Sequence, residues 1–322
     1  MPQDGTIVGI DVSKLKVDGC IRSLGLRLSK PSSPDGRKEM IAWLREHKVV
    51  LAVMEASGGY ERPWAEALRQ AGIKVRIVDP KRVRYFAKSA GKLAKNDPID
   101  AEMIAWYAET FPDATDQPHD PDREELSLLV TARQTLLDVK TQLGNWSEHH
   151  QPRAVERAQS ALLKALRAEI RRLEAAMAAK IKARKDFARR AEIVDSVPGL
   201  GDLASAGVIA MLPELGHISN KAAGALLGAA PYDDDSGGHK GDRHIKGGRR
   251  NIRTLLYMPI VGAATRHNPV LKAFYQRLRA KGKEGKVALI ACMRKLIVIL
   301  NTMLARGEKW DPAKYAPEPL VT

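Results

Sequence analysis

Cysteine and aromatic residues are scarce in this chain of 322 residues. The two cysteines, Cys20 and Cys292, lie far apart and show no C-x-x-C spacing, so the sequence predicts neither a zinc site nor a disulfide framework. Aromatic residues make up only 5% of the chain, whereas hydrophobic residues of all kinds make up 44%. We therefore expect a sizeable core that is built mainly from aliphatic side chains and alanine.

Long uninterrupted apolar runs are also lacking. The first residues, MPQDGTIVGIDVS, show no basic segment followed by an apolar one, so no signal peptide is predicted. The most apolar late segment, Val287–Leu304, is interrupted by Arg294 and Lys295, which favours a core helix over a membrane span. Together with the few cysteines, this pattern predicts a cytoplasmic protein without a membrane partner.

Acidic residues are in deficit. The chain has 38 Asp and Glu against 53 Lys and Arg, and its formal net charge is +15. A surplus of this size favours a polyanionic partner, either a nucleic acid or an anionic membrane surface. Because no membrane segment is visible, we favour a nucleic acid, and a nucleoid-associated location in the cytoplasm.

The first 115 or so residues alternate β-branched runs with helical stretches, which predicts an α/β domain. The segment from Pro31 to Gly36 is expected to interrupt the chain. The expected order is three strands, helix, strand, helix, strand, helix, and this order is typical of a ribonuclease-H-like fold. The strands are expected over Thr6–Asp11, Val17–Ile21, Leu26–Ser29, Val49–Met54 and Lys74–Val78, and the helices over Lys38–Glu46, Pro63–Ala71 and Pro98–Thr110.

The rest of the chain is expected to be mainly helical. Residues 112–122 are polar and proline-rich and predict a linker. From Arg123 to about Arg190, apolar residues recur every three or four positions, which favours a coiled-coil-like hairpin or an oligomer contact; packing on the chain's own body is the alternative. From Ala191, small, glycine and basic residues dominate. We predict three domains, over residues 1–115, 116–190 and 191–322.

Four acidic residues occupy positions where an α/β sheet binds ligands. Asp11 and Glu55 end two predicted buried strands, and Asp97 and Asp100 lie three residues apart at the start of a predicted helix. If the two strands are neighbours, the four carboxylates converge, and Mg²⁺ would offset their repulsion and hold the oxygens of a phosphodiester. Each acid alone could instead cap a helix or hold a turn. The other acids of this region are interpreted as surface charges: Asp4, Asp18, Glu61 and Glu102.

The segment Val194–Leu212 has the pattern of a helix-hairpin-helix. A Pro-Gly-Leu-Gly turn, which contains Gly199 and Gly201, separates a helix from a helix rich in small residues. The backbone N–H groups of such a turn can accept a DNA phosphate without reading the base sequence. An ordinary helix–turn–helix packing unit is the alternative.

Ser236 lies between three aspartates and two glycines and is followed by a strongly basic run. A serine hydroxyl attacks a phosphodiester only when it is deprotonated or meets a polarised electrophile, and arginines stabilise the charge that develops. We interpret Ser236 as a candidate nucleophile, against the plainer alternative of an ordinary loop followed by a solvated surface. The candidate DNA-binding cations of this run are Lys240, Arg243, Lys246, Arg249, Arg250 and Arg253.

Five short motifs occur in order along the chain: GIDVSK, MEASGGY, KNDPIDA, VPGLG and DSGGHKG…GGRRNIR. Together they closely resemble the DEDD transposases of the insertion-sequence one-ten family, which includes Piv/MooV-like invertases. The resemblance spans nearly the whole chain. It differs at Pro98, where a basic or polar residue is expected, although proline is compatible with the first turn of a helix.

The resemblance implies a RuvC-like N-terminal domain of ribonuclease-H type, a coiled-coil segment and a C-terminal transposase domain. It implies that Asp11, Glu55, Asp97 and Asp100 bind Mg²⁺ and that Ser236 forms a covalent link to DNA. It also implies a structured bridge RNA that guides donor and target DNA, and homodimers that assemble into a tetramer. In that assembly, the RuvC-like domain of one subunit completes its site with the serine domain of another.

Two other functions remain open from the residues alone. The chain could be a metal-dependent, junction-resolving nuclease that uses water, with Ser236 as a bystander. It could also be a non-catalytic DNA-binding or architectural protein whose carboxylates only cap helices.

Overall fold

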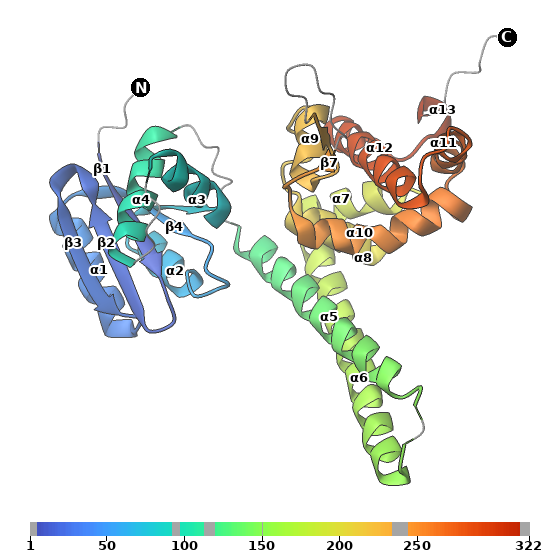
Figure 1. Ribbon diagram of the computed structural model, residues 1–322, viewed down its shortest axis with the longest axis horizontal. Helices are drawn as coiled ribbons and strands as arrows, with labels where there is room; N and C mark the ends of the chain where they lie inside the picture. The colour runs from blue at the N-terminus through green and yellow to red at the C-terminus, as the bar shows by residue number, and fades with distance from the viewer. Residues whose placement is uncertain (1–4, 92–96, 113–119, 150, 234–243, 316–322) are drawn as a thin grey trace. The chain divides into compact units, whose positions relative to one another are not determined.

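The computed structural model describes residues 5–91, 97–112, 120–149, 151–233 and 244–315, without the side chains of residues 97–99. The chain divides into two compact units, Met1–Gln117 and Pro118–Thr322 (Figure 1). The residues predicted to form a helical segment and a C-terminal domain both fall in the second unit. Each unit is described by itself.

The first unit is built on a five-stranded mixed sheet. Its strands are β1 (Thr6–Val12), β2 (Lys16–Ile21), β3 (Leu26–Pro31), β4 (Val49–Glu55) and β5 (Lys74–Val78), in the order β3-β2-β1-β4-β5. The first three strands pair antiparallel, whereas β4 lies parallel to β1 and β5 lies parallel to β4. The mixed α/β class is therefore confirmed, and the architecture is compatible with a ribonuclease-H-like fold.

Helices cover both faces of this sheet (Figure 1). On one face, α1 (Pro34–Glu46) and α2 (Arg62–Gln70) share a buried cluster with alternate residues of β1, among them Val8 and Ile10. On the other face, α3 (Pro80–Ser89) and α4 (Asp97–Thr110) share a second cluster with Leu51 and Val53 of β4. The side chains of a strand alternate between the two faces, so the face of any strand residue follows from these clusters.

Two helices differ from the sequence prediction. Helix α1 begins at Pro34, one turn before Lys38, because the Ser33 hydroxyl accepts a hydrogen bond from the Gly36 N–H at 3.1 Å and proline suits the first helical turn. Helix α3 was not predicted at all. The Asp79 carboxylate accepts a hydrogen bond from the Lys81 N–H at 2.9 Å, and Pro80 follows that cap. An Asp-Pro step directly after a strand was the signal that could have revealed α3.

Helix α4 lies directly on β1 at Gly9. A Cβ atom added to Gly9 would lie 2.2 Å from the Ala101 carbonyl oxygen and 2.4 Å from the Ala105 nitrogen, which are both backbone atoms of α4. No side chain fits between the two backbones, so this position requires glycine. The close contact holds the N-terminal half of α4 against the strand that carries Asp11.

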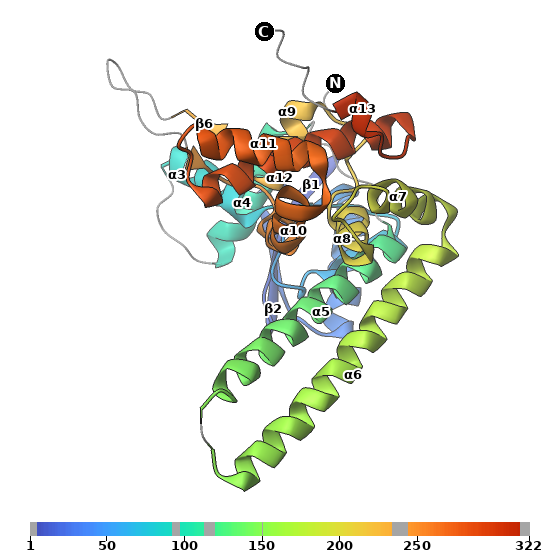
Figure 2. The same ribbon diagram turned by 90° about the vertical axis from the view of Figure 1, so that its right-hand side faces the viewer.

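The second unit begins with two long helices, α5 (Pro121–Trp146) and α6 (Arg153–Ala183), which lie side by side as a hairpin (Figures 1 and 2). Near the body of the unit, Leu126, Val130 and Met177 are buried in its large core cluster. This end of the hairpin therefore packs on the chain's own body. Other large apolar side chains of the hairpin are exposed, and the predicted oligomer contact remains a prediction.

The body of this unit is almost entirely helical. Its core helix α12 (Gly285–Arg306) contains the apolar segment that was predicted to be a core helix, and Cys292, Leu296 and Leu300 are buried in the core cluster. Among the described residues, α12 is the one helix with the length and composition to cross a membrane, and 56% of its most apolar window is buried inside the unit. The remaining helices and strands are α7 (Lys185–Asp195), α8 (Asp202–Met211), α9 (Asn220–Leu227), β6 (Pro231–Tyr232), β7 (His244–Ile245), α10 (Arg250–Gly262), the π-helix η2 (Ala263–His267), α11 (Pro269–Ala280) and α13 (Pro312–Tyr315).

Replacing Gly9 with alanine tests the contact between β1 and α4. We expect Gly9→Ala to destabilise the first unit by about 1–3 kcal/mol, because the added methyl group overlaps backbone atoms that cannot move aside cheaply. Hydrogen–deuterium exchange followed by mass spectrometry should show faster exchange of the α4 amides. The control is Gly144→Ala in α5, where an added Cβ meets nothing within 4 Å and alanine favours the helix. Unchanged exchange in α4 would contradict this account.

Candidate active site

Asp11 and Glu55 lie side by side at the ends of two neighbouring parallel strands. The register pairs Ile10 of β1 with Met54 of β4, so Asp11 and Glu55 occupy the next position on each strand. Neighbouring strands are about 4.8 Å apart. Both side chains belong to the face covered by α3 and α4, because Asp11 follows Gly9 by two residues and Glu55 follows Val53 by two. The sheet thus brings together two of the four predicted carboxylates.

Asp100 reaches this region from α4. It lies one residue before Ala101, whose backbone touches Gly9, and one turn before the buried Ile104. Asp97 is the first residue of α4, and its position three residues before Asp100 predicts that it shares the same face. The side chain of Asp97 is outside the described part of the structure.

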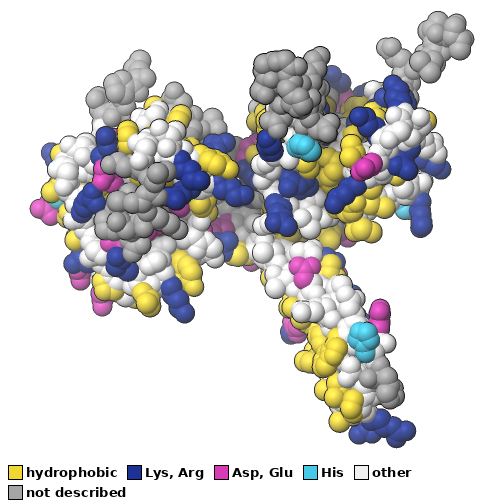
Figure 3. Space-filling model, in the orientation of Figure 1, with side chains coloured by type: hydrophobic (Ala, Val, Ile, Leu, Met, Phe, Trp, Pro, Cys, Tyr) yellow, Lys and Arg dark blue, Asp and Glu magenta, His cyan; other side chains and the backbone are white. Residues whose placement is uncertain are grey.

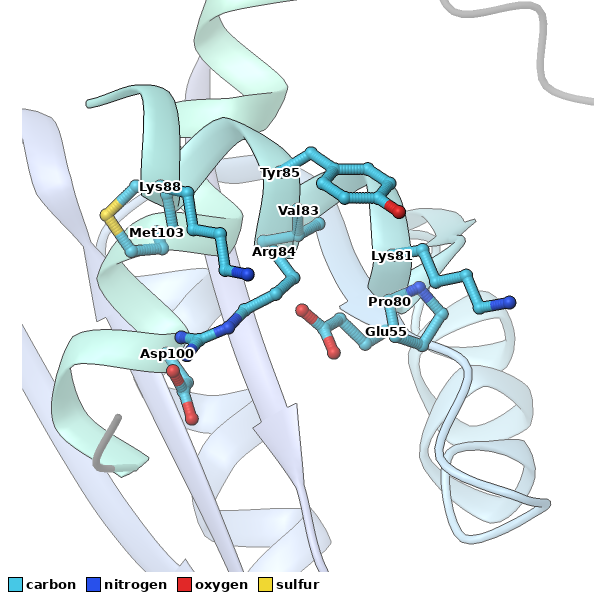
Figure 4. Close-up of a pocket in the computed structure, with 10 residues that line it drawn as sticks. Glu55, Pro80, Lys81, Val83, Arg84, Tyr85, Lys88, Asp100 and Met103 are labelled. Carbon is cyan, nitrogen blue, oxygen red and sulfur yellow. The ribbon is translucent and has the colours of Figure 1, made fainter. Parts of the chain in front are cut away.

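Glu55 and Asp100 line one hollow of about 440 Å³. Figure 4 shows both carboxylates pointing into this hollow, with the Arg84 side chain extending from α3 toward Asp100. Asp11 is not among the lining residues, and its closeness to Glu55 follows from the strand register. The other residues that line the hollow are Pro80, Lys81, Val83, Tyr85, Ala87, Lys88 and Met103.

The donor set suits a hard divalent cation. Mg²⁺ prefers carboxylate oxygens, and the hollow leaves room for the water ligands that it usually keeps. Among the described residues, no three acidic, histidine or cysteine side chains are close enough to hold a metal ion by themselves. Asp97, the fourth predicted ligand, is not part of that set. The joint binding of a metal ion by Asp11, Glu55, Asp97 and Asp100 therefore remains a prediction.

Asp18 is a buried acid beside the site, and its interpretation as a surface charge was wrong. It is only 8% exposed, and it is the direct cross-strand partner of Asp11 in the β1–β2 ladder. Directly opposed residues of an antiparallel pair project to the same face. The Lys16 ammonium group lies 3.0 Å from the Asp18 carboxylate and offsets its charge. Asp18 and Lys16 therefore form the outer neighbours of Asp11.

Glu61 was also misinterpreted as a surface charge. It is 6% exposed, and one carboxylate oxygen accepts hydrogen bonds from the Ser57 N–H at 3.0 Å, the Ser57 hydroxyl at 2.9 Å and the Gly59 N–H at 2.8 Å. These bonds fix the loop that directly follows Glu55. Burial by itself raises the pKa of Glu61, but the hydrogen bonds outweigh it and hold the pKa below the ordinary value of 4.5.

The predicted helix-hairpin-helix is present in the second unit as α7, a turn and α8. Gly199 has a φ of +94°, and an added Cβ would lie 2.7 Å from the Cβ of Ala263 in η2. Its first role is therefore close packing. Gly201 is exposed at the start of α8, but Asp202 follows it with an acid in the first turn, which disfavours an anion there. A phosphate contact at this turn remains a prediction.

Two of the predicted DNA-binding arginines hold the fold together. The Arg249 guanidinium forms a two-pronged ion pair with Glu214, with one contact of 2.8 Å, and also donates to the Met211 carbonyl oxygen. The Arg253 guanidinium donates to the carbonyl oxygens of Leu227, Gly228 and Gly247 at 3.0–3.3 Å. These contacts give both arginines a structural role that the sequence alone did not reveal, and their contact with DNA remains a prediction.

The contacts of Arg253 fasten the base of the segment that contains Ser236. Strands β6 and β7 pair antiparallel on either side of that segment. At its base, an added Cβ on Gly248 would lie 2.1 Å from the nitrogen of Gly228, so glycine is required there. Ser236, Lys240 and Arg243 lie outside the described residues. Of the other candidate cations, Lys246 and Arg250 are exposed.

A second basic region was missed by the sequence analysis. The segment that spans α11 and the start of α12 carries eight cations and the single acid Glu284, and no ion pair within the described residues involves these cations. Arg277 and Lys295 both lie about 5 Å from the ring of Phe274. Figure 3 shows basic side chains along this part of the unit. The eight cations are Lys272, Arg277, Arg279, Lys281, Lys283, Lys286, Arg294 and Lys295.

The variant Glu61→Gln should reveal how much the Glu61 carboxylate contributes to the free energy of unfolding, because this contribution depends on pH. Because the folded-state pKa of Glu61 is lowered, its stabilisation is fully present above the ordinary pKa and is lost as the pH falls through the folded-state pKa. We expect the variant to be about 1.5–3 kcal/mol less stable at pH 7, the usual worth of hydrogen bonds to a charged group. The difference should shrink toward zero at acidic pH in urea unfolding curves. A difference that is independent of pH would contradict the assignment.

Comparisons with known proteins agree with this geometry. A family model described as a transposase, of DEDD and IS110 type, matches residues 8–150, and one described as the transposase IS116/IS110/IS902 family matches residues 191–276. The first match includes all four predicted metal ligands, and the second includes Ser236.

Individual relatives point the same way. The pilin gene-inverting protein of Moraxella lacunata is 24% identical over 328 aligned residues, which cover 95% of this chain and 98% of the relative. An uncharacterized 44.8 kDa protein of the insertion element IS116 from Streptomyces clavuligerus is 33% identical over 137 residues, or 41% of this chain and 32% of the relative. The chain belongs to the IS110-type transposase family, and it is an enzyme that recombines DNA.

Proposed function

We propose that this transposase recombines DNA through Ser236, acting together with Mg²⁺ held by Asp11, Glu55, Asp97 and Asp100. The observation that carries the proposal is the meeting of Asp11 and Glu55 on adjacent strand ends, with Asp100 of α4 on the same face. Enzymes of the DEDD type use a divalent metal ion. When bound, Mg²⁺ would polarise the phosphodiester and offset the charge that develops on its oxygens.

The serine supplies the exchange of bonds in this proposal. The Ser236 oxygen loses its proton and forms a bond to phosphorus, while one P–O bond of the DNA backbone breaks. The released deoxyribose oxygen takes up a proton. Attack by the hydroxyl group of another DNA end reverses the exchange and rejoins the strand. Such a covalent intermediate conserves the phosphodiester energy, so no external energy source is required.

The structure narrows the set of side chains that we assign to DNA. Arg249 and Arg253 serve the fold, so we assign phosphate contacts to Lys246 and Arg250, and to Lys240 and Arg243 in the serine segment. The cations of α11 and α12 add a further basic surface.

The partners proposed from the resemblance are donor DNA, target DNA and a structured bridge RNA. Homodimers would assemble into a tetramer in which the carboxylates of one subunit act with Ser236 of another. The sites fit this arrangement, because all four acids belong to the first unit and Ser236 belongs to the second. We place the enzyme in the cytoplasm, at the nucleoid.

A water-using nuclease is the rival function. It is favoured by one observation: the described metal ligands and their hollow are complete within the first unit, without any residue of the second. In that case Ser236 would have no chemical role. The two functions differ in whether protein becomes attached to DNA.

A covalent adduct distinguishes the two functions. The purified chain is mixed with RNA transcribed from its flanking DNA, labelled donor and target DNA, and Mg²⁺. We expect a denaturation-resistant protein–DNA adduct that is absent in Ser236→Ala and reduced about 100-fold or more in Glu55→Gln, because an essential charge stabiliser is lost. Ser147→Ala, a change at an exposed serine after α5, is the matched control. Free cleaved ends that are equally abundant in Ser236→Ala would instead establish the nuclease.

Adjacent arginines test the division between structural and DNA-binding cations. Arg249→Ala leaves the half-buried Glu214 without its partner, so we expect a loss of about 1–3 kcal/mol of unfolding free energy. Arg250→Ala should leave stability within about 0.5 kcal/mol, as is usual for exposed positions, and should weaken DNA binding. Thermal unfolding and fluorescence anisotropy with labelled DNA measure the two effects. A stability loss in Arg250→Ala that equals the loss in Arg249→Ala would overturn the division.

A further inference from the structure

Helix α3 is a basic helix beside the carboxylates. Its ten residues include four cations and no acid. Within the described part of the chain, none of these cations forms an ion pair. Elsewhere in the same unit several basic residues are paired with acids, as in Arg22 with Glu109 at 2.6 Å, or Arg27 with Glu102. The four cations of α3 are Lys81, Arg82, Arg84 and Lys88.

Three of these cations line the hollow that Glu55 and Asp100 also line. Lys81, Arg84 and Lys88 are spaced by three and four residues, so they share one face of the helix. Figure 4 shows Arg84 and Lys88 on the side of the hollow where Asp100 lies, whereas Lys81 extends outward beside Pro80, and Figure 3 shows basic side chains gathered over α3. Val83 and Ala87 of α3 are buried and anchor the helix in the core.

The basic face of α3 is long enough to reach more than one phosphate. Lys81 and Lys88 are seven residues apart, or about 10 Å along a helix. Like charges on neighbouring turns repel one another, and a polyanion relieves the repulsion. A single strand that follows α3 would therefore pass directly over the carboxylates.

Tyr85 provides a second, independent feature. Its side chain is 69% exposed, although it lies between cations on a helix whose other aromatic residue, Phe86, packs against Trp106 and Tyr107. An exposed ring among cations is the combination with which proteins bind single-stranded nucleic acid, because an unpaired base can stack on it. In a duplex, both faces of each base are covered by its neighbours.

We propose that α3 binds one unpaired DNA strand at the point of cleavage, with Lys81, Arg84 and Lys88 on its phosphates and Tyr85 stacked on a base. The inference rests on the proposed function, because the strand on α3 is the one that the carboxylates and Ser236 act on. It adds that the DNA is opened locally at the site before it is cut. DNA is the occupant because this family acts on DNA.

Stacking on Tyr85 can be measured without cleavage. The full chain, in Ca²⁺ in place of Mg²⁺, is titrated with a DNA duplex that contains a short unpaired bubble with 2-aminopurine in it. We expect wild type and Tyr85→Phe to quench the 2-aminopurine fluorescence. Tyr85→Ala should not quench it and should bind the bubble about tenfold more weakly, the usual effect of one lost stacking contact. Binding of a fully paired duplex should be unchanged.

The cations are tested by the salt dependence of binding to single-stranded DNA. Lys81→Ala combined with Lys88→Ala should lower the slope of log affinity against log salt by about 1.4, or about 0.7 for each lost phosphate contact. The matched control is Lys38→Ala combined with Lys74→Ala, which removes the same charge from exposed positions on α1 and at the far end of β5. The control should leave the slope unchanged.

The proposal is overturned if Tyr85→Ala quenches like wild type, if it weakens bubble and paired DNA equally, or if the control changes the slope as much as the α3 variant. An RNA bubble that is quenched through Tyr85 while DNA is not would assign α3 to the guide RNA. The proposed function and the proposal for α3 are tested by different measurements. In Ser236→Ala the quenching of 2-aminopurine should persist while the protein–DNA adduct is lost. The adduct therefore tests the role of Ser236, and the quenching tests the role of α3.

Discussion

The candidate active site depends on a contact between two backbones. Gly9 has no side chain, so α4 can lie on β1 with the Ala101 carbonyl group against the strand. Asp11 follows Gly9 on the same face, and Asp100 precedes Ala101 on the helix. One missing Cβ therefore sets how closely the helix that carries Asp100 approaches the strand that carries Asp11. The apolar cluster around Ile104 stabilises the packing of α4 on the sheet, and Gly9 sets the distance between the two backbones.

Like charges gathered at one place oppose folding, and the first unit offsets them locally. Lys16 neutralises Asp18, and the N–H groups of the following loop satisfy Glu61. Asp11, Glu55 and Asp100 share the end of the sheet with the cations of α3. In the proposed function, this arrangement would attract both a metal ion and the phosphates of the DNA. The negative charges of the carboxylates and the positive charges of α3 thus lie at the same end of the sheet.

The strands and the strand-end acids could be predicted from the sequence because both follow local rules. Each predicted strand of the first unit is present within about two residues of its expected ends, and Asp11 and Glu55 are where the buried runs end. Helix α3 was missed because its apolar stripe is short and lies among four cations, although Val83 and Ala87 are buried and Phe86 and Ala90 pack against their cluster. Arg249 was assigned to DNA because its partner Glu214 lies 35 residues away, and no local pattern reveals such a pair. The prediction that Asp18 and Glu61 are surface charges was wrong for the same reason. The burial of Asp18 depends on a neighbouring strand, and the burial of Glu61 depends on the geometry of its loop.

Basic residues therefore fall into two classes that composition cannot separate. A net charge of +15 indicates a polyanionic partner. Arg249 and Arg253, however, form hydrogen bonds within the second unit. The cations of α3, α11 and α12 have no acidic partner among the described residues. The second class is present in both units. The acids belong to residues 1–117 and Ser236 to residues 118–322, so the proposed reaction requires both units, of one chain or of two, to meet on one phosphodiester. In the proposed reaction, DNA bound to the cations of each unit would bring the carboxylates and Ser236 together.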